Sequence, residues 1–402
     1  MTPETKNMIA AMSLSLAILI GWQIYFVEPE LEAEKAAFEA QQQAQQDGSI
    51  PQPKAGSSNG TVSASSANQS LAAVRDTGTR LDIIAPLVTG SISTLGARID
   101  DLILTTYYQT QEPDSEPIRL FTRFDSQQPY FAEFGWVNAA GQTLSLPNSQ
   151  TVWQAQNASL TPESPLVLRH DNGEGLVFER RIEINDDYLM TITQSVTSNL
   201  DIEASLNPYG LIRRKGTPAT AGLYILHEGP LGVFDETLNE QNYDDLQDAG
   251  TDGIVIDTED KGGWIGITDK YWLAALMPSQ DQHVSYSMRA LGAMRDTYQT
   301  DLLGDTQILR PGQTISWQTN MFAGAKQVTL LDKYSQDLKI ANFDLAIDFG
   351  WFYFLTKPFF YAVNWLNSLL GNFGLAIIAF TILVRLVLFP LANKSYKSMA
   401  RM

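Results

Sequence analysis

The apolar positions of the chain are concentrated in two long stretches, one near each end. Residues 8–27 (MIAAMSLSLAILIGWQIYFV) contain no charged residue, and a helix of that length spans about 30 Å, the thickness of a bilayer core. Trp22, Tyr25 and Phe26 fit an aromatic belt at the membrane surface. A cleaved signal peptide is the alternative, but bulky residues stand where small ones should precede the cut. The pattern favours an uncleaved transmembrane anchor over residues 1–27.

The second apolar stretch covers residues 371–391 and contains a single charge. It follows a break at Gly371-Asn372, and Arg385 is its one charged residue. Burying a guanidinium in a lipid-spanning helix costs about 2.5–3.5 kcal/mol even on lenient scales. One interpretation places Arg385 beside a wet cavity, and the other has it partly snorkelled toward the inner leaflet. Thr381 lies four residues earlier on the same helix face, and Pro390 is expected to bend or end the helix.

The segment before this stretch, residues 343–370, is rich in aromatic residues and is broken by Pro358. Its polar positions recur with a helical period and form one face, made of Lys357, Tyr361, Asn364 and Ser368. The other faces are apolar, which favours an amphipathic helix lying in the membrane surface over a further span. The candidate residues at the membrane interface are Lys357, Trp365 and Trp351.

Between the N-terminal anchor and residue 343 the pattern changes twice. Residues 28–78 begin with good helix formers and continue as a Gly-, Ser-, Pro- and Asn-rich stretch, which predicts a flexible helical and low-complexity linker. Residues 79–326 carry short β-type runs separated by turns. About 250 residues of this kind predict a large two-sheet sandwich. Helical periodicity returns immediately afterwards and predicts a connecting helix over 327–342.

The clearest hairpin of the β region joins Leu176–Ile184 to Tyr188–Val196 through Asn185-Asp186-Asp187. Arg310-Pro311-Gly312-Gln313 is a turn before the last run. The further predicted strands are Leu166–Leu168, Gly222–Leu226, Gly253–Ile256, Trp264–Thr268, Val284–Met288 and Ile315–Phe322.

Charge adds a topology to this pattern. The formal net charge is −18, and the acidic residues lie mainly between the two apolar stretches, whereas residues 392–402 carry Lys394, Lys397 and Arg401. Positive charge marks the cytoplasmic side, so both termini are expected in the cytoplasm and the β region outside, in the periplasm of a Gram-negative cell. Nucleic-acid binding is disfavoured, because it needs clustered basic residues. Only Arg213-Arg214-Lys215 forms such a cluster, and it is expected to be a solvated loop.

Nothing in the sequence indicates covalent catalysis. There is no cysteine, no His-Glu-x-x-His, no Gly-x-Ser-x-Gly and no phosphate-binding loop. The three histidines, His170, His227 and His283, are expected to be ordinary strand or loop residues. Sandwich domains can bind sugars through aromatic side chains, but the tryptophans are expected to be core or edge residues (Trp136, Trp153, Trp264, Trp272 and Trp317). We expect no cofactor and no metal.

The C-terminal region resembles the YidC family of membrane protein insertases, in its Gram-negative bacterial form. Residues 350–402 (GWFYFLTKPFFYAVNWLNSLLGNFGLAIIAFTILVRLVLFPLANKSYKSMARM) follow the family order of interfacial helix, Gly-Asn break, span with a lone arginine and basic helix. The GGWIGITDKYWLAALMP and RPGQT segments resemble the periplasmic domain of the family. The resemblance implies a galactose-mutarotase-like supersandwich between an N-terminal transmembrane helix and the C-terminal helices, in a multi-pass protein of the bacterial inner membrane.

The resemblance also implies insertion without covalent catalysis. Arg385 would lie in a hydrophilic groove open to cytoplasm and lipid, with Thr381 lining it. The implied partners are nascent membrane proteins, the lipid bilayer, the Sec translocon with its accessory subunits, and a ribosome at the cytoplasmic part. Family members continue past Met402 with a helical hairpin and further spans, so the sequence is expected to be a fragment. The alternatives are a membrane-anchored periplasmic sugar-binding protein and a translocon scaffold.

Overall fold

The computed structural model describes residues 78–112, 114–218, 226–249, 253–258, 261–350 and 352–399, with side chains as far as Pro390. The predicted N-terminal anchor, almost all of the predicted linker, most of the predicted strand at 222–226, and Trp351 lie outside these residues.

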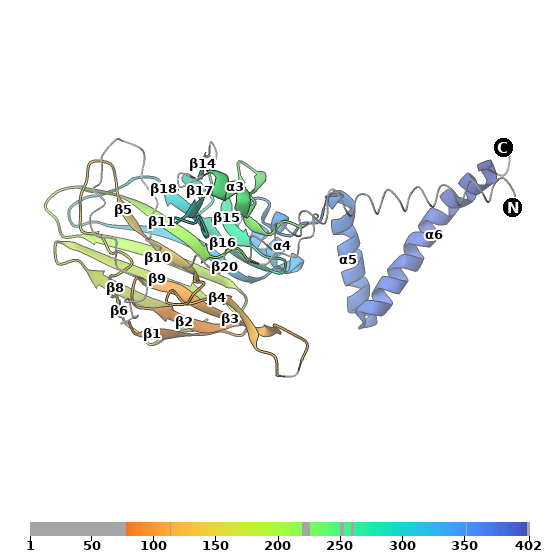
Figure 1. Cartoon of the computed structure of the whole chain (residues 1–402), viewed down its shortest axis with the longest axis horizontal. Coiled ribbons are helices and arrows are strands. Elements are labelled where there is room, and N and C mark those ends of the chain that lie inside the picture. Colours follow the sequence, from red (N-terminus) through yellow and green to blue (C-terminus); the bar gives the residue numbers. More distant parts are fainter. Residues whose placement is uncertain are drawn as a thin grey trace.

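Two β-sheets packed face to face make up most of the molecule (Figure 1). The larger sheet has the order β14-β17-β18-β11-β5-β3-β2-β1-β7, with β4 beside β3 and β19 beside β11. The smaller has the order β13-β12-β15-β16-β20-β10-β9-β8-β6. Neighbouring strands are antiparallel except for β1 and β7. This is the predicted two-sheet sandwich, and its strands run from Arg80 to Ala325.

The larger sheet consists of β1 (Arg80–Ile84), β2 (Val88–Ser93), β3 (Arg98–Tyr108), β4 (Pro117–Phe121), β5 (Tyr130–Asn138), β7 (Ser159–Leu160), β11 (Ala204–Lys215), β14 (Ile254–Asp257), β17 (Val284–Leu291), β18 (Thr297–Gly304) and β19 (Gln307–Leu309). The smaller sheet consists of β6 (Gln154–Ala155), β8 (Leu166–Asp171), β9 (Leu176–Ile184), β10 (Leu189–Ser198), β12 (Gly229–Phe234), β13 (Thr237–Glu240), β15 (Trp264–Thr268), β16 (Trp272–Pro278) and β20 (Thr314–Ala325). The helices are α3 (Tyr243–Ala249), α4 (Val328–Asp337), the 3-10 helix η3 (Phe343–Ala346), α5 (Tyr353–Leu370) and α6 (Phe373–Met399).

The predicted hairpin is confirmed as β9 and β10. The Asn185 side chain accepts hydrogen bonds from the backbone N–H groups of Asp187 and Leu189, which fixes the turn. Alternate side chains of β9 are buried, as a strand with one core face requires. The predicted turn at 310–313 is also present, with Gln313 N–H bonded to the Arg310 carbonyl.

The expectation of a solvated loop at Arg213-Arg214-Lys215 is wrong. These residues end strand β11. Arg213 is buried and donates to the Gln299 carboxamide, and Arg214 pairs with Asp269 at 2.6 Å. Both arginines have a partner on a distant segment, so the cluster is a structural part of the sheet.

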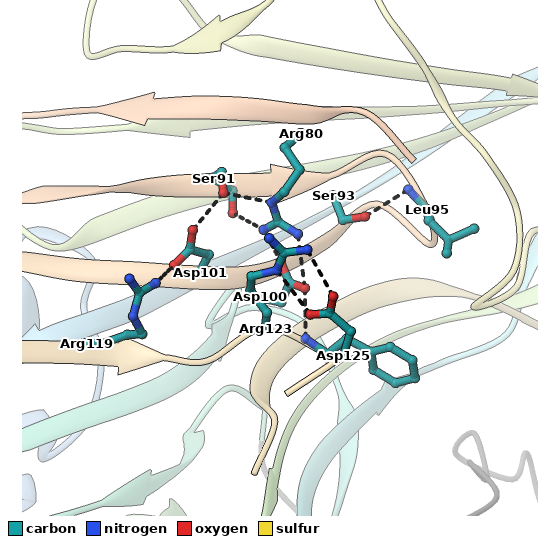
Figure 2. A network of polar contacts seen from close by, with 10 residues as sticks. Arg80, Ser91, Ser93, Leu95, Asp100, Asp101, Arg119, Arg123 and Asp125 are labelled. Atoms are coloured by element: carbon teal, nitrogen blue, oxygen red, sulfur yellow. Dashed lines mark hydrogen bonds and ion pairs between the residues drawn. The ribbon is translucent and has the colours of Figure 1, made fainter. Parts of the chain in front are cut away.

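The first four strands are tied together by a polar network (Figure 2). Arg80 pairs with Asp100 at 2.5 Å, and the Ser91 hydroxyl donates to Asp101 at 2.8 Å. Asp101 also pairs with Arg119 of β4. The network therefore joins β1, β2, β3 and β4 through side chains as well as through the backbone ladder.

Gly90 lies where this sheet leaves no room for a side chain. Its φ is +150°, and a Cβ atom would lie 1.9 Å from the Asp101 carbonyl oxygen. We expect Gly90→Ala to lower the free energy of unfolding by about 2 kcal/mol or more, because the β2–β3 ladder must shift. Gly141→Ala is the control, since Gly141 has φ +84° but open space around it. Urea unfolding should show the smaller loss at Gly141, and equal losses would contradict the steric argument.

The C-terminal helices differ from the prediction in three respects. Residues 343–370 do not form one helix, because η3 packs into the sandwich and α5 begins only at Tyr353. Helix α5 also continues through Pro358 without a break, and α6 continues through Pro390. Each proline removes one backbone hydrogen bond, and the remaining turns of the helix continue on both sides of it.

Candidate functional site

Helix α6 is the part of the described chain that can cross a membrane. Phe373–Pro390 is the one 18-residue stretch among the described residues that is long and apolar enough. The predicted Gly371-Asn372 break is present: Gly371 has φ +66°, and the Asn372 side chain accepts a hydrogen bond from Leu375 N–H at the start of α6. Large apolar side chains such as Leu386 and Val387 are exposed, which suits contact with lipid.

Arg385 and Thr381 lie one helical turn apart on α6. The Thr381 hydroxyl donates to the Ile377 carbonyl at 2.8 Å, so its proton is used within the helix while its lone pairs stay free. Arg385 is exposed. Among the described residues it has no hydrogen bond and no ion pair. The structure therefore brings these two residues to one face without bonding them to each other.

Helix α5 packs against α6 and presents apolar side chains outward. Phe359 of α5 meets Phe380 of α6 edge to face at 5.1 Å, and Ala376 is buried. Many aromatic and aliphatic residues of α5 are exposed, including Phe354 at 75% and Trp365 at 63%. In Figure 1 the two helices form a V that projects from one end of the sandwich.

Lys357, predicted at the membrane interface, is held by the sandwich end of the molecule. Its Nζ lies 2.9 Å from Asp332 Oδ1 of α4, 2.5 Å from Asp344 Oδ2 of η3 and 3.0 Å from the Tyr353 hydroxyl. The sequence reasoning missed both aspartates, which lie 25 and 13 residues before the lysine. The sequence did contain one indication of an ion pair, because Lys357 is the only charged residue in α5.

The pKa values at this contact follow from burial and pairing. Burial opposes the charged form of Lys357, but the hydrogen bonds to Asp344, Tyr353 and Asp332 outweigh it and raise the pKa of its ammonium. For Asp344, burial is likewise outweighed by the hydrogen bonds from Lys357 and Tyr353, and the pKa of its carboxyl is lowered. Both groups are therefore charged throughout the physiological range.

This pairing predicts how the stability contributions of Asp344 and Lys357 depend on pH. The Asp344 contribution to stability is present above its ordinary pKa of 3.8 and is lost as pH falls through the lowered value. The Lys357 contribution is present below its ordinary pKa of 10.5 and is lost as pH rises through the raised value. We therefore expect Lys357 to react with an amine-selective reagent at pH 9 at least about tenfold more slowly than the exposed Lys333. Asp344→Asn should speed the Lys357 reaction, and equal rates for the two lysines would contradict the pairing.

The sandwich contains a small polar cavity between its sheets. It is lined by Gly96, Glu133, Phe134, Gly135, Trp136, Pro147, Asn148, Trp153, Glu179, Arg180, Gln194 and Tyr209. Its room for the centre of a water molecule is about 10 Å³, which is about what one water needs. The buried carboxylate of Glu133 is already bonded to Arg98 and to the Tyr209 hydroxyl.

The residues considered for chemistry take structural roles. Trp136, Trp153, Trp264 and Trp317 are buried in the core, as expected, and Trp272 is partly buried at the start of β16. His227 contacts the Pro230 carbonyl, His283 contacts the Thr258 carbonyl, and His170 lies beside the Trp153 ring. Among the described residues no group of three or more His, Cys, Asp or Glu side chains could hold a metal ion.

Comparisons with known proteins match the chain almost throughout. The family model of the YidC periplasmic domain matches residues 80–362, and that of the 60Kd inner membrane protein matches residues 365–402. The boundary between the two falls inside α5.

Curated relatives agree with the family models. A membrane protein insertase YidC of Nitrobacter hamburgensis is 42% identical over all of this chain and 67% of its own length. That of Rickettsia africae is 40% identical over 98% of this chain and 69% of its own, and that of Bradyrhizobium diazoefficiens is 40% identical over 100% and 68%. The chain thus spans about two thirds of the length of these relatives.

Solved structures match the sandwich only distantly. A galactose mutarotase related enzyme from Lactobacillus acidophilus covers 61% of this chain and 97% of its own at 11% identity, with a TM-score of 0.41. A galactose mutarotase-like protein from Lactobacillus casei covers 61% and 100% at 8% identity, with a TM-score of 0.42. Family membership rests on the sequence matches. They cover a periplasmic domain followed by an inner membrane protein segment, in the order in which the sandwich and α6 follow each other in the fold. The chain belongs to the YidC family of membrane protein insertases.

Proposed function

We propose that α6 forms one wall of a hydrophilic groove through which this insertase passes the polar tails of its substrates. The observation that carries the proposal is Arg385, a cation in an apolar span with no partner among the described residues. Such a charge is expensive in lipid unless it faces water or a counter-charge. Thr381 extends the polar face by one turn and still offers an acceptor.

The physical cycle needs no covalent step. An acidic or polar tail of an incoming span is attracted to Arg385, and the attraction grows as the effective dielectric constant falls inside the membrane. The apolar segment of the substrate then moves into lipid, which supplies the driving force through burial of apolar surface. Water in the groove screens the charge pair, so the tail can leave again.

The topology and partners follow from the same proposal. Basic residues after α6 favour a cytoplasmic C-terminal end, with the sandwich in the periplasm and the N-terminal end also inside. The lipid-exposed faces of α5 and α6 contact the bilayer. Nascent membrane proteins are the substrates, the Sec translocon and its accessory subunits are partners at the sandwich, and a ribosome docks at the cytoplasmic side.

Photo-crosslinking tests the groove. A photoreactive amino acid at position 381 of the full-length protein should give adducts with an arrested nascent membrane protein. The same amino acid at position 383 is the matched control, because Leu383 lies about 200° away around the helix and is exposed. We expect clearly more adduct at position 381. Equal yields at the two positions would show that the substrate passes no particular face of α6.

The alternative of a sugar-binding protein is less well supported by the geometry. The cavity between the sheets holds about one water, whereas a sugar ring is many times larger. Four of the five tryptophans considered for stacking are buried. The scaffold alternative differs in its prediction, because a pure scaffold would insert nothing through α6 and would leave Arg385 dispensable.

A further inference from the structure

The Lys357 cluster, which consists of Lys357, Asp332, Asp344 and Tyr353, is the contact where α5 meets the sandwich. One ammonium is shared by two carboxylates, and the Tyr353 hydroxyl donates to Asp344 as well. The charged side chains are only 12–18% exposed. Paired charges with bonds this short and this little exposure make a fixed contact, unlike a surface ion pair.

Asp344 belongs to a segment that packs tightly into the sandwich. Its neighbour Phe343 is fully buried and packs edge to face against Trp264 at 5.3 Å and Phe322 at 5.9 Å. The Asn342 side chain donates to the Glu236 carbonyl at 2.8 Å. The η3 segment therefore belongs to the core of the β domain and carries Asp344 with it.

Asp332 lies on α4, which also packs tightly against the sandwich. Leu331 and Tyr334 of this helix are buried against the sheet, and the Tyr334 hydroxyl accepts a hydrogen bond from Asn185 at 2.7 Å. Two separate elements of the sandwich thus present their carboxylates to one lysine of α5.

The connection between η3 and α5 is otherwise weak. It contains Gly350, with φ +71° and open space around it. Apart from the Lys357 cluster, the contacts across it between described residues are the Thr356 hydroxyl bonded to the Phe349 carbonyl and the edge-to-face pair of Phe349 and Tyr353. Both involve residues of the connection itself, so Lys357, together with the Tyr353 hydroxyl bonded to Asp344, is what joins α5 to the body of the domain.

We propose that Lys357, held by Asp332 and Asp344, is a positioning residue that fixes α5 on the periplasmic domain and thereby sets the orientation of α6 and Arg385 for insertion. Helix α5 has no other charge, so this contact decides which face it turns toward the domain and leaves its apolar faces for the bilayer. Packing of Phe359 on Phe380 passes the orientation to α6. The inference rests on the groove proposed for α6.

The test combines a distance with an activity. Spin labels at Val255 on the edge of the sandwich and Ser368 on α5, both exposed, should give one narrow distance distribution in the full-length protein in bilayers. Lys357→Glu should broaden it and slow insertion roughly threefold to tenfold, because the groove wall formed by α6 is misplaced. The exchange Lys357→Glu with Asp344→Lys should restore both. Where Lys357→Glu does not accumulate, Lys357→Gln removes the charge instead.

Two controls separate this inference from the groove itself. Lys333→Glu reverses an exposed charge on α4 that pairs loosely with Asp187 at 3.8 Å, and it should change neither readout. Arg385→Ala should slow insertion while the distance distribution stays narrow. A narrow distribution in Lys357→Glu would overturn the positioning role, and so would a broad one with normal insertion. Normal insertion in Arg385→Ala alone would overturn the groove but not the contact.

Discussion

Arg385→Ala should slow insertion of substrates with acidic translocated tails by about tenfold, through loss of the charge attraction that draws the tail into the membrane. Arg385→Lys should keep most of the rate, because a point charge is enough where the described residues offer no bidentate partner. The effect should be largest at low ionic strength, since added salt screens a groove that is open to water.

The measurement is the initial rate of insertion into proteoliposomes that contain the full-length protein. Two versions of one substrate, with Asp or with Asn in the tail, separate the charge effect from general damage. We expect Arg385→Ala to affect the Asp version far more. Thr381→Val is a second variant on the same face and should have a smaller effect, because its hydroxyl is bonded to Ile377. Equal losses for both substrate versions would contradict an electrostatic role for Arg385.

The membrane part of the fold could largely be predicted from local sequence. A long apolar run, a Gly-Asn break and a helical polar stripe depend on neighbours in the chain. The structure has α6 and the break where they were expected, and α5 over the second part of the predicted 343–370 helix. The prolines were the exception. Pro358 and Pro390 are poor helix residues by propensity. Each nevertheless lies inside a long helix that continues on both sides, so the rest of the helix outweighs the local preference of the proline.

The charged residues could not be placed from the sequence, because their partners are distant along the chain. Arg213 meets Gln299 across 86 positions, and Arg214 meets Asp269 across 55. Lys357 was placed on the polar face of an interfacial helix, whereas its ammonium turns toward acids on two other elements. Helical period predicts which face a residue lies on, and only the tertiary fold decides what that face meets.

The order of the strands could not be predicted from the sequence either. It creates a weakly bonded seam in the larger sheet. Strands β3 and β5 are neighbours in the larger sheet, yet their ladder has one registered pair, Ile99 with Ala132. Arg180 of the smaller sheet crosses the core and donates to the Ala97 and Phe134 carbonyls beside this seam. Burial outweighs the neighbouring charges of Tyr209 and Glu133, and the pKa of the Arg180 guanidinium falls to about 10. The hydrogen bonds from Arg180 thus replace some of the backbone hydrogen bonds that the β3–β5 seam lacks.

The same seam is also closed by Arg98 of β3 and Glu133 of β5. Arg98 Nε lies 3.1 Å from Glu133 Oε2, and the two side chains are 1% and 4% exposed. The guanidinium also lies 3.9 Å from the centre of the Phe124 ring. Glu133→Ala should therefore lower the free energy of unfolding by about 3–5 kcal/mol, because it leaves a buried cation without its counter-charge.

A second substitution distinguishes loss of the pair from loss of the seam. Replacing both members, as Arg98→Met with Glu133→Leu, should recover most of the stability, since apolar residues of similar volume often substitute for a buried ion pair. Asp125→Ala is the matched control. Its pair with Arg123 (Figure 2) has side chains about 40% exposed, so it should be worth at most about 1 kcal/mol. Urea unfolding of each variant gives the values. A loss at Glu133 no larger than at Asp125 would mean that the sheet holds this seam without the ion pair.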